Sequence, residues 1–181
     1  KIRGIDLSAA LALPGVFGAV TGRDFPTPYG IIPWTPDENA LAVEKVCHVG
    51  DGVAAVAAID EDTANAALRA IKVDYEPLRA YFDPEEALAA QGREATVNPY
   101  SKKGNVSKHV LLEFGEVDAE LGRADLVVEG EYFFEGTTHG AIEPHCALAH
   151  LEASGVLTVW SATQVSHYLH RELSRVLGLS P

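Results

Sequence analysis

Residues 132–149 read YFFEGTTHGAIEPHCALA, and residues 155–164 read GVLTVWSATQ. The first stretch carries a histidine and the sequence Glu-Pro-His-Cys in line with strand-like residues, and the second alternates as a strand and ends on Ser-x-Thr-Gln. Strands that only pack a core rarely gather so many hydrogen-bonding groups. This part of the chain therefore predicts buried strands that serve a chemical site.

The surrounding C-terminal sequence predicts further regular elements. Residues 126–134 alternate as a long strand, and residues 146–151 and 156–160 alternate as the two strands of a hairpin. A short acidic helix follows Gly115-Glu116-Val117-Asp118. A second helix spans residues 165–177, because apolar side chains recur there at helical spacing.

The N-terminal part begins with short elements that are separated by turn residues. Asp6-Leu7-Ser8 offers an N-cap for a helix over residues 9–13, which Pro14-Gly15 ends. A strand over residues 16–20 follows, and residues 21–39 are predicted as a long loop that is rich in proline, glycine and aspartate. Another strand is predicted over residues 45–49.

The next segment predicts a strand, a helix and a strand in that order. Residues 53–59 form an uninterrupted apolar run, typical of a central strand that is buried on both faces. Asp60-Glu61-Asp62-Thr63 caps a helix over residues 64–70, where acidic residues in the first turn suit the helix dipole, and residues 71–75 alternate as a half-buried strand. This order favours a mixed or parallel sheet with flanking helices, so the predicted fold class is α/β (α+β).

Asp83-Pro84 opens another short helix that runs through Ala90, and the polar residues 91–108 then read as a linker. The predicted domains are therefore residues 1–90 and residues 109–181.

Composition excludes several classes of function. The chain has 181 residues and a formal net charge of -12, which argues against a nucleic-acid-binding protein, because such proteins need clustered lysine and arginine. No apolar run is long enough for a membrane span, and no signal peptide opens the chain.

Cys47 and Cys146 lie in apolar runs and predict buried free thiols in a reducing compartment such as the cytoplasm. Methionine is absent and the sequence starts in mid-pattern, so we expect a piece of a longer polypeptide.

Several segments, taken in order, resemble one protein family. Residues 6–16, 45–54 and 73–78 resemble the α/β hammerhead domain of the xanthine dehydrogenase/aldehyde oxidase family, the molybdenum hydroxylases. Residues 115–118 and 124–130, followed by the segments that contain His139, Glu143 and Ser161 to Gln164, resemble the start of its molybdopterin-binding domain. Within the family, residues 29–33 and 55–75 look most like the large subunit of 4-hydroxybenzoyl-CoA reductase. Where family members commonly carry Gln-Pro after Gly50, this chain has Asp51-Gly52.

The resemblance implies a set of cofactors and partners. The large subunit would bind a molybdopterin cofactor, in bacteria usually the cytosine dinucleotide form. Iron–sulfur (2Fe–2S) clusters and FAD would be held by partner subunits or domains of an oligomeric complex. The implied reaction is hydroxylation of an aldehyde or an aromatic heterocycle with oxygen from water, or reductive dehydroxylation of an aryl-CoA substrate.

The same resemblance suggests site residues. It places Gln164 beside the molybdenum, where an amide can donate a hydrogen bond without ligating the metal or titrating. His139 and Glu143 would support the cofactor pocket through hydrogen bonds. The glutamate that serves as general base in the family lies beyond Pro181, so no catalytic residue is predicted in this chain and the chain alone should be inactive.

Two alternatives remain open at this point. A protein-bound metal is disfavoured, because the adjacent residues His145 and Cys146 would point to opposite faces of a strand, and the histidine spacing fits no known zinc pattern. An interaction module without its own catalysis is the second alternative. In that case the apolar loop from Tyr29 to Trp34 would dock an electron-transfer subunit.

Overall fold

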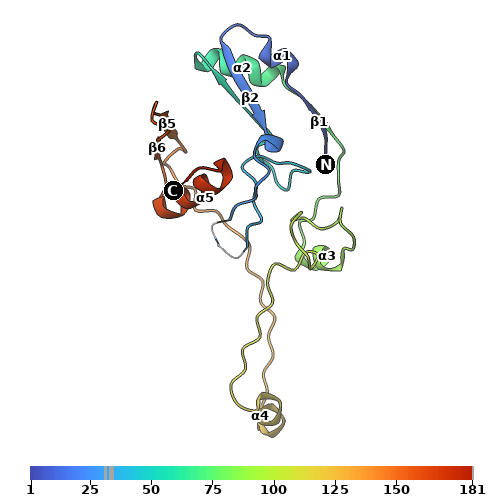
Figure 1. Ribbon diagram of the computed structural model, residues 1–181. Helices are drawn as coiled ribbons and strands as arrows, with labels where there is room; N and C mark the ends of the chain where they lie inside the picture. Colours follow the sequence, from blue (N-terminus) through green and yellow to red (C-terminus); the bar gives the residue numbers. More distant parts are fainter. Residues whose placement is uncertain (31, 33–34, 181) are drawn as a thin grey trace. The chain divides into compact units, whose positions relative to one another are not determined.

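The computed structural model describes residues 1–30, 32 and 35–180, which group into two compact units. The first unit contains Lys1–Ser107 together with the chain from Val165 onward, and the second unit is Lys108–Gln164. Figure 1 labels the elements. In chain order they are β1 (Ile2–Asp6), α1 (Ser8–Leu11), β2 (Val16–Thr21), the 3-10 turn η1 (Gly22–Asp24), β3 (Ala54–Ala58), α2 (Glu61–Ala70), β4 (Lys72–Tyr75), α3 (Pro84–Ala89), α4 (Val117–Arg123), β5 (Ala147–Leu151), β6 (Leu157–Ser161) and α5 (Ser166–Leu177).

The strands of the first unit form two antiparallel pairs. β1 pairs with β4, with Ile5 opposite Val73, and β2 pairs with β3, with Ala19 opposite Val56. The predicted α/β class and the strand–helix–strand order of β3, α2 and β4 are confirmed. The expected parallel pairing is wrong among the described residues, because β3 and β4 each hydrogen-bond to an earlier antiparallel strand instead of to each other.

The predicted central strand is also more exposed than expected. Burial along β3 alternates between half-buried and exposed, and the next residue, Ile59, keeps 68% of its surface exposed. One face of this strand therefore packs and the other meets solvent, as in a two-stranded antiparallel pair.

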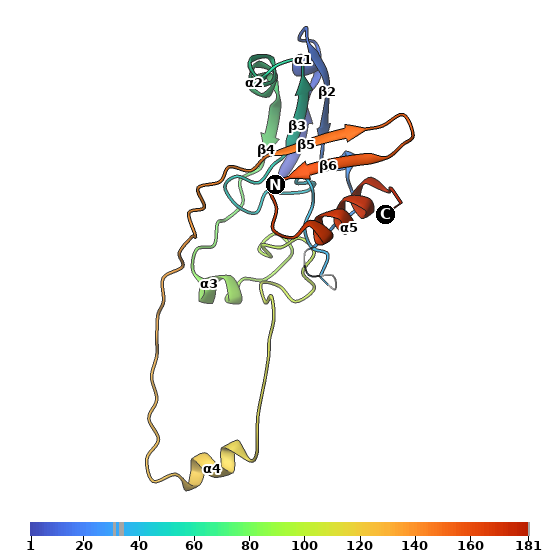
Figure 2. The same cartoon turned by 90° about the vertical axis from the view of Figure 1, so that its left-hand side faces the viewer.

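Side-chain caps define where two helices of the first unit begin. Asp60 Oδ1 accepts a hydrogen bond from the backbone N–H of Thr63 at 2.8 Å, and Asp83 does the same for Glu86 at 2.8 Å. α2 packs against α1 and against the β2–β3 pair, and the two helices lie together in Figure 2. Ala10 of α1 and Ala67 of α2 are fully buried, because small side chains allow the helices to approach closely.

Residues 45–49 do not form the predicted strand. The Asp51 carboxylate accepts the backbone N–H of Cys47 at 2.7 Å, and the N–H of Asp51 bonds to the carbonyl of His48. This local turn uses the backbone groups that a strand would offer to a neighbour. Cys47 and Cys146 are both free, as predicted, but both are exposed rather than buried, because neither lies within a regular strand.

The polar segment predicted as a linker, residues 91–108, makes many contacts with residues 37–47 of the same unit. Asn98 donates a hydrogen bond to Asp37 at 2.8 Å, and the Cys47 thiol donates to the Val97 carbonyl at 3.3 Å. Asn105 organises the segment, because its side chain accepts from the Val97 N–H and donates to two backbone carbonyls. The segment is therefore held by specific polar contacts.

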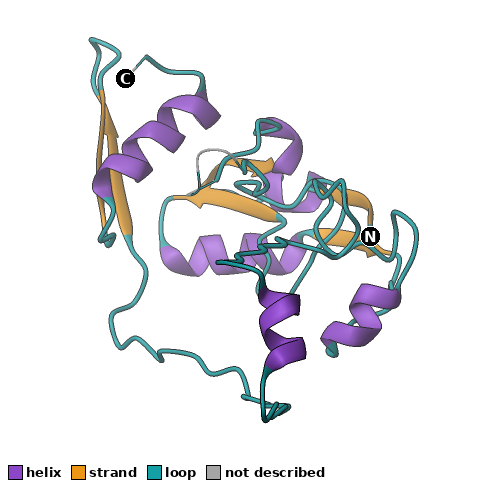
Figure 3. Ribbon diagram, turned by 90° about the horizontal axis from the view of Figure 1, so that it is seen from below, coloured by secondary structure: helices purple, strands orange, loops and turns teal. Residues whose placement is uncertain are grey.

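The second unit contains one helix and one hairpin. β5 and β6 pair in antiparallel register, with Leu148 opposite Trp160, which confirms the predicted hairpin. The predicted acidic helix is α4, and long stretches of loop lead to it and away from it (Figure 3).

The predicted strand over residues 126–134 is wrong. Those residues are irregular, and Tyr132 and Phe133 are each 93% exposed. A strand requires a hydrogen-bonded neighbour, and within the described chain no segment pairs with this one.

Candidate functional site

The predicted site residue Gln164 lies between a hairpin and a helix. The pairing of β5 with β6 continues past the strand ends, since the N–H of Ala162 donates to the carbonyl of Cys146 at 3.1 Å. The N–H of Thr163 then bonds to the carbonyl of Ser161 at 2.9 Å and turns the backbone away from the hairpin. Only Val165 separates Gln164 from the first residue of α5 along the chain, and the Gln164 side chain is exposed.

His139 and Glu143 lie in the irregular segment before β5. Both are exposed, and Gly140 between them adopts a left-handed backbone conformation, with φ of 60°, that turns the chain. In the part of the chain that the structure describes, no hydrogen bond links either side chain to Gln164. The structure therefore places all three predicted residues in the second unit and does not bring them into contact.

The side chains near Gln164 are neutral hydrogen-bonding groups. Ser161 and Thr163 supply hydroxyls, and Gln164 supplies an amide. The described residues contain no group of three or more histidine, cysteine, aspartate or glutamate side chains that could hold a metal ion. This donor set fits a cofactor that brings its own metal ligands and needs only hydrogen-bonding support from the protein.

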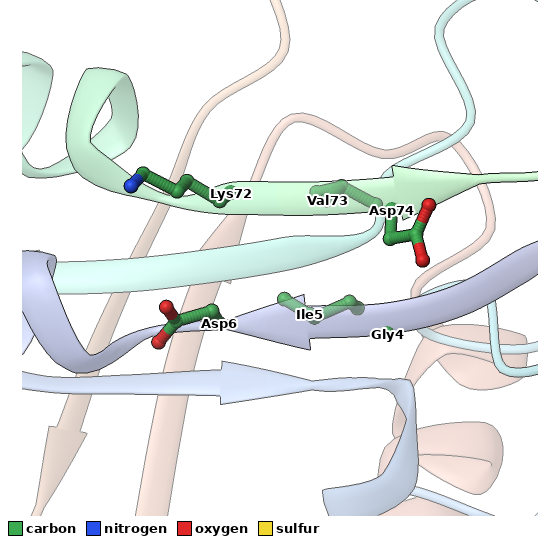
Figure 4. A pocket seen from close by; sticks show the side chains of 6 residues that line it. All are labelled: Gly4, Ile5, Asp6, Lys72, Val73 and Asp74. Carbon is green, nitrogen blue, oxygen red and sulfur yellow. The ribbon is translucent and has the colours of Figure 1, made fainter.

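A shallow depression lies elsewhere, on the β1–β4 pair of the first unit (Figure 4). Asp6 lies at one end of it, and the hydroxyl and N–H of Ser8 hold the pKa of that carboxyl below its usual value, with a smaller contribution from Lys72. The depression contains none of the predicted site residues. The residues that line it are Gly4, Ile5, Asp6, Lys72, Val73 and Asp74.

The apolar loop that could dock a partner is described only in part. Tyr29 is partly buried. Burial is the main cause that raises the pKa of its phenol, and the negative charge of the neighbouring Glu38 is the second cause. Ile32 is 51% exposed. Ile31 and Trp34, on which the docking alternative also depends, lie outside the described residues.

A buried carboxylate on α5 was missed by the sequence reasoning. Glu172 is only 7% exposed, and its Oε1 accepts a hydrogen bond from Arg171 Nε at 2.6 Å. The signal was present in the sequence, because position 172 falls on the same helical face as the apolar residues Leu169 and Val176, and arginines stand one residue before and three after it.

Comparison with known proteins identifies two consecutive matches. Residues 1–79 match the family described as aldehyde oxidase and xanthine dehydrogenase, a/b hammerhead domain, and residues 98–181 match the molybdopterin cofactor-binding domain. The chain belongs to the xanthine dehydrogenase/aldehyde oxidase family. The order of the two matches is the order that the sequence motifs predicted.

Individual members of the family match along nearly all of this chain. The large molybdopterin subunit of nicotinate dehydrogenase from Eubacterium barkeri is 35% identical over 99% of the chain. The molybdenum-binding subunit of xanthine dehydrogenase from Escherichia coli O157:H7 is 33% identical over 94% of it. The solved structure of aldehyde oxidoreductase from Desulfovibrio gigas superimposes with a TM-score of 0.80 at 30% identity and covers 100% of the chain.

These relatives are much longer than the present chain. It spans 41% of the nicotinate dehydrogenase subunit, 23% of the xanthine dehydrogenase subunit and 21% of the aldehyde oxidoreductase chain. None of the helices in the described residues has the length and apolar character needed to cross a membrane.

Proposed function

We propose that this chain forms part of the molybdenum-cofactor-binding large subunit of an oxidoreductase. The observation that carries the proposal is the succession of a hammerhead match and a cofactor-domain match along one chain. The whole length of this chain superimposes on part of aldehyde oxidoreductase. The predicted domain division, with a hammerhead domain over residues 1–90, a linker over 91–108 and the start of the cofactor domain over 109–181, is part of this proposal.

Gln164 is the residue through which this chain would act on the cofactor. When bound, the molybdenum cofactor supplies the two-electron redox chemistry that protein side chains lack. With the cofactor bound, the Gln164 amide would donate a hydrogen bond toward the ligands of the metal, and because an amide carries no charge and does not titrate, it would orient them without changing its own state. His139 and Glu143 support the wall of the pocket, and no residue of this chain is assigned the role of general base.

The proposal includes the redox partners of the subunit. Partner subunits or domains would hold 2Fe–2S clusters and FAD as the electron acceptors, and the pterin would be the cytosine dinucleotide form. Several relatives carry the word subunit in their names, which supports a multi-subunit complex. We also assign the complex to the cytoplasm, since both cysteines of the chain are free thiols.

Among the candidate substrates we favour an aromatic heterocycle. Nicotinate dehydrogenase and xanthine dehydrogenase are both named for such molecules, while aldehyde oxidoreductase is named for an aldehyde. Hydroxylation with oxygen from water is the proposed direction. Reductive dehydroxylation of an aryl-CoA, as in 4-hydroxybenzoyl-CoA reductase, is the alternative direction.

The first experiment is metal and pterin analysis of the purified complex by mass spectrometry. We expect molybdenum and a pterin dinucleotide near one per large subunit. A fully folded complex without molybdenum would contradict the proposal and would favour the interaction-module function.

A variant then tests the role of Gln164. Gln164→Ala should lower turnover per bound molybdenum by about tenfold or more, because removing one oriented hydrogen-bond donor from a reacting centre has an effect of this order. Gln91→Ala is the matched control, since Gln91 is an exposed glutamine of the first unit, and it should leave turnover unchanged. Equal turnover in the two variants would remove the assigned role.

A further inference from the structure

The second half of α5 contains an unusual buried charge. Among the described residues, Glu172 is the one charged side chain that is buried, at 7% exposure. The other buried side chains of the first unit are small, and they include Ala10, Ala42 and Ala67. A carboxylate in such surroundings is costly unless positive charges and hydrogen bonds compensate it, so its partners are expected to be specific.

Two arginines of the same helix compensate Glu172. Arg171 Nε donates to Oε1 at 2.6 Å, and Arg175 Nη1 lies 3.9 Å from Oε2. No donor within the described residues hydrogen-bonds Oε2, although that atom is fully enclosed. The carboxylate is therefore held mainly from one side, and its position depends on where Arg171 is held.

Arg171 in turn links α5 to the loop around Gly30. Its guanidinium donates to the Gly30 carbonyl at 3.4 Å and stacks over the ring of Tyr168 at 4.8 Å. The backbone approaches closely at Gly30, because a side chain there would come within 2.5 Å of the Thr35 carbonyl oxygen.

The backbone around that loop is closed by a small bridge. Tyr29 and Glu38 exchange hydrogen bonds of 2.8 and 3.0 Å through their backbones. Glu172 is among the negative charges that raise the pKa of the Tyr29 phenol, after burial and Glu38, which places the carboxylate near this bridge. The Tyr29–Glu38 bridge thus lies next to the carbonyl of Gly30 to which α5 is attached.

We propose that Glu172 is a positioning residue for Gln164. By orienting Arg171 toward the Gly30 carbonyl, Glu172 holds α5 on the first unit, and the start of α5 lies one residue beyond Gln164. The inference rests on the proposed function, because Gln164 has a role only where the molybdenum cofactor is bound. Glu172 itself would not contact the cofactor. Its role would be to set the location of the Gln164 amide, which would.

The test is Glu172→Gln in the purified complex, with two separate readouts. Amide hydrogen exchange of α5 should become at least about tenfold faster, since both arginines lose their counter-charge. Turnover per bound molybdenum should fall about tenfold while KM stays within about twofold, because a small displacement of a positioning group reduces the rate more than substrate binding. The electron paramagnetic resonance spectrum of the molybdenum should change in the same variant.

Two further variants separate positioning from loss of folding. Glu172→Asp keeps the carboxylate and should restore most of the exchange protection and turnover. If it is as impaired as Glu172→Gln, the charge is not the cause and the proposal is overturned. The matched control is Glu120→Gln, because Glu120 also pairs with an arginine three residues later, Arg123, but on exposed α4. It should change neither readout.

A double-mutant cycle tests the route through Gln164. If Glu172 acts by placing Gln164, then Glu172→Gln should cause no further loss of turnover in a Gln164→Ala background. Independent, multiplying losses would overturn the inference, and so would unchanged turnover with loosened α5. If the wild-type complex contains no molybdenum, the proposed function fails. The exchange experiment would still decide whether Glu172 anchors the helix.

Discussion

In the first unit, Ala10 and Ala67 are fully buried between packed helices, whereas in the second unit Phe114 and Phe133 keep 88% and 93% of their surface exposed. Both units carry apolar residues at regular spacing in the sequence. In the first unit, four strands pair two by two, and α1 and α2 pack against each other and against the β2–β3 pair, so part of the apolar surface has a partner. In the second unit only the β5–β6 hairpin is paired. The difference teaches that an apolar pattern becomes a packed element only when a complementary surface lies within reach.

The largest expected difference between the units is in hydrogen exchange. Backbone amides of residues 126–134 should exchange at nearly the rate of an unfolded peptide, because no strand pairs with them among the described residues. Paired amides of β2 and β3 should exchange slower by roughly a thousandfold or more, given the usual stability of a small domain. Hydrogen–deuterium exchange with mass spectrometry on the 181-residue chain measures both. Equal protection would erase the contrast between the units.

A pair of substitutions tests the contrast in packing. Ala67→Leu should lower the free energy of unfolding by about 1–3 kcal/mol, because the added carbons have no space between α1 and α2. Phe133→Ser removes a whole aromatic ring, yet it should change that free energy by less than about 0.5 kcal/mol, since the ring is already exposed. Urea unfolding of the 181-residue chain measures both. A larger effect at Phe133 would show that the second unit has a core of its own.

A smaller effect is expected at the start of α2. Hydrogen bonds from the side chain and backbone of Thr63 hold the pKa of Asp60 below its usual value of 3.8. Because the folded-state pKa is lowered, the stabilisation by Asp60 is present above pH 3.8 and disappears as the pH falls through the lower folded-state value. Asp60→Asn should therefore lower the unfolding temperature at neutral pH and make little difference in strong acid.

The control for this prediction is Asp62→Asn, which lies in the first turn of α2 but accepts none of the capping hydrogen bonds. Its effect on thermal unfolding should be smaller at neutral pH. A pH profile for Asp60→Asn that runs parallel to the wild type would refute the contribution of the Asp60 charge to the cap.

The smallest effect is expected for the ion pair between Glu44 and Arg93. Arg93 Nη2 lies 2.7 and 3.0 Å from the two carboxylate oxygens, but both side chains are largely exposed. A double-mutant cycle with Glu44→Gln and Arg93→Gln should give a coupling of less than about 1 kcal/mol. Raising the salt concentration to about 1 M should remove most of it. A larger coupling would mean that this pair anchors the 91–108 segment.

Much of the fold was predictable wherever a local signal decides the structure. The capping aspartates Asp60 and Asp83 marked helix starts that the structure confirms, because a cap is a contact between residues three apart. The hairpin of β5 and β6 was predictable for a similar reason, since a short loop forces its two strands to meet.

Predictions failed where distant or competing partners decide. Residues 45–49 have a strand-like sequence, but the Asp51 carboxylate takes the N–H of Cys47 and makes a turn. Of the candidate site, the sequence located Gln164, His139 and Glu143 but not the buried Glu172, whose environment depends on the Gly30 loop more than a hundred residues earlier in the chain.

By itself, the sequence determined the succession of β3, α2 and β4, the caps of α2 and α3, the β5–β6 hairpin, the acidic net charge and the family to which the chain belongs. These follow from residue identity and from contacts between neighbours in the chain. Only the tertiary structure decided which strands pair, which thiols are exposed and which carboxylate is buried. Those features depend on free energies of pairing and desolvation between segments that are far apart in the sequence, and no local pattern encodes them.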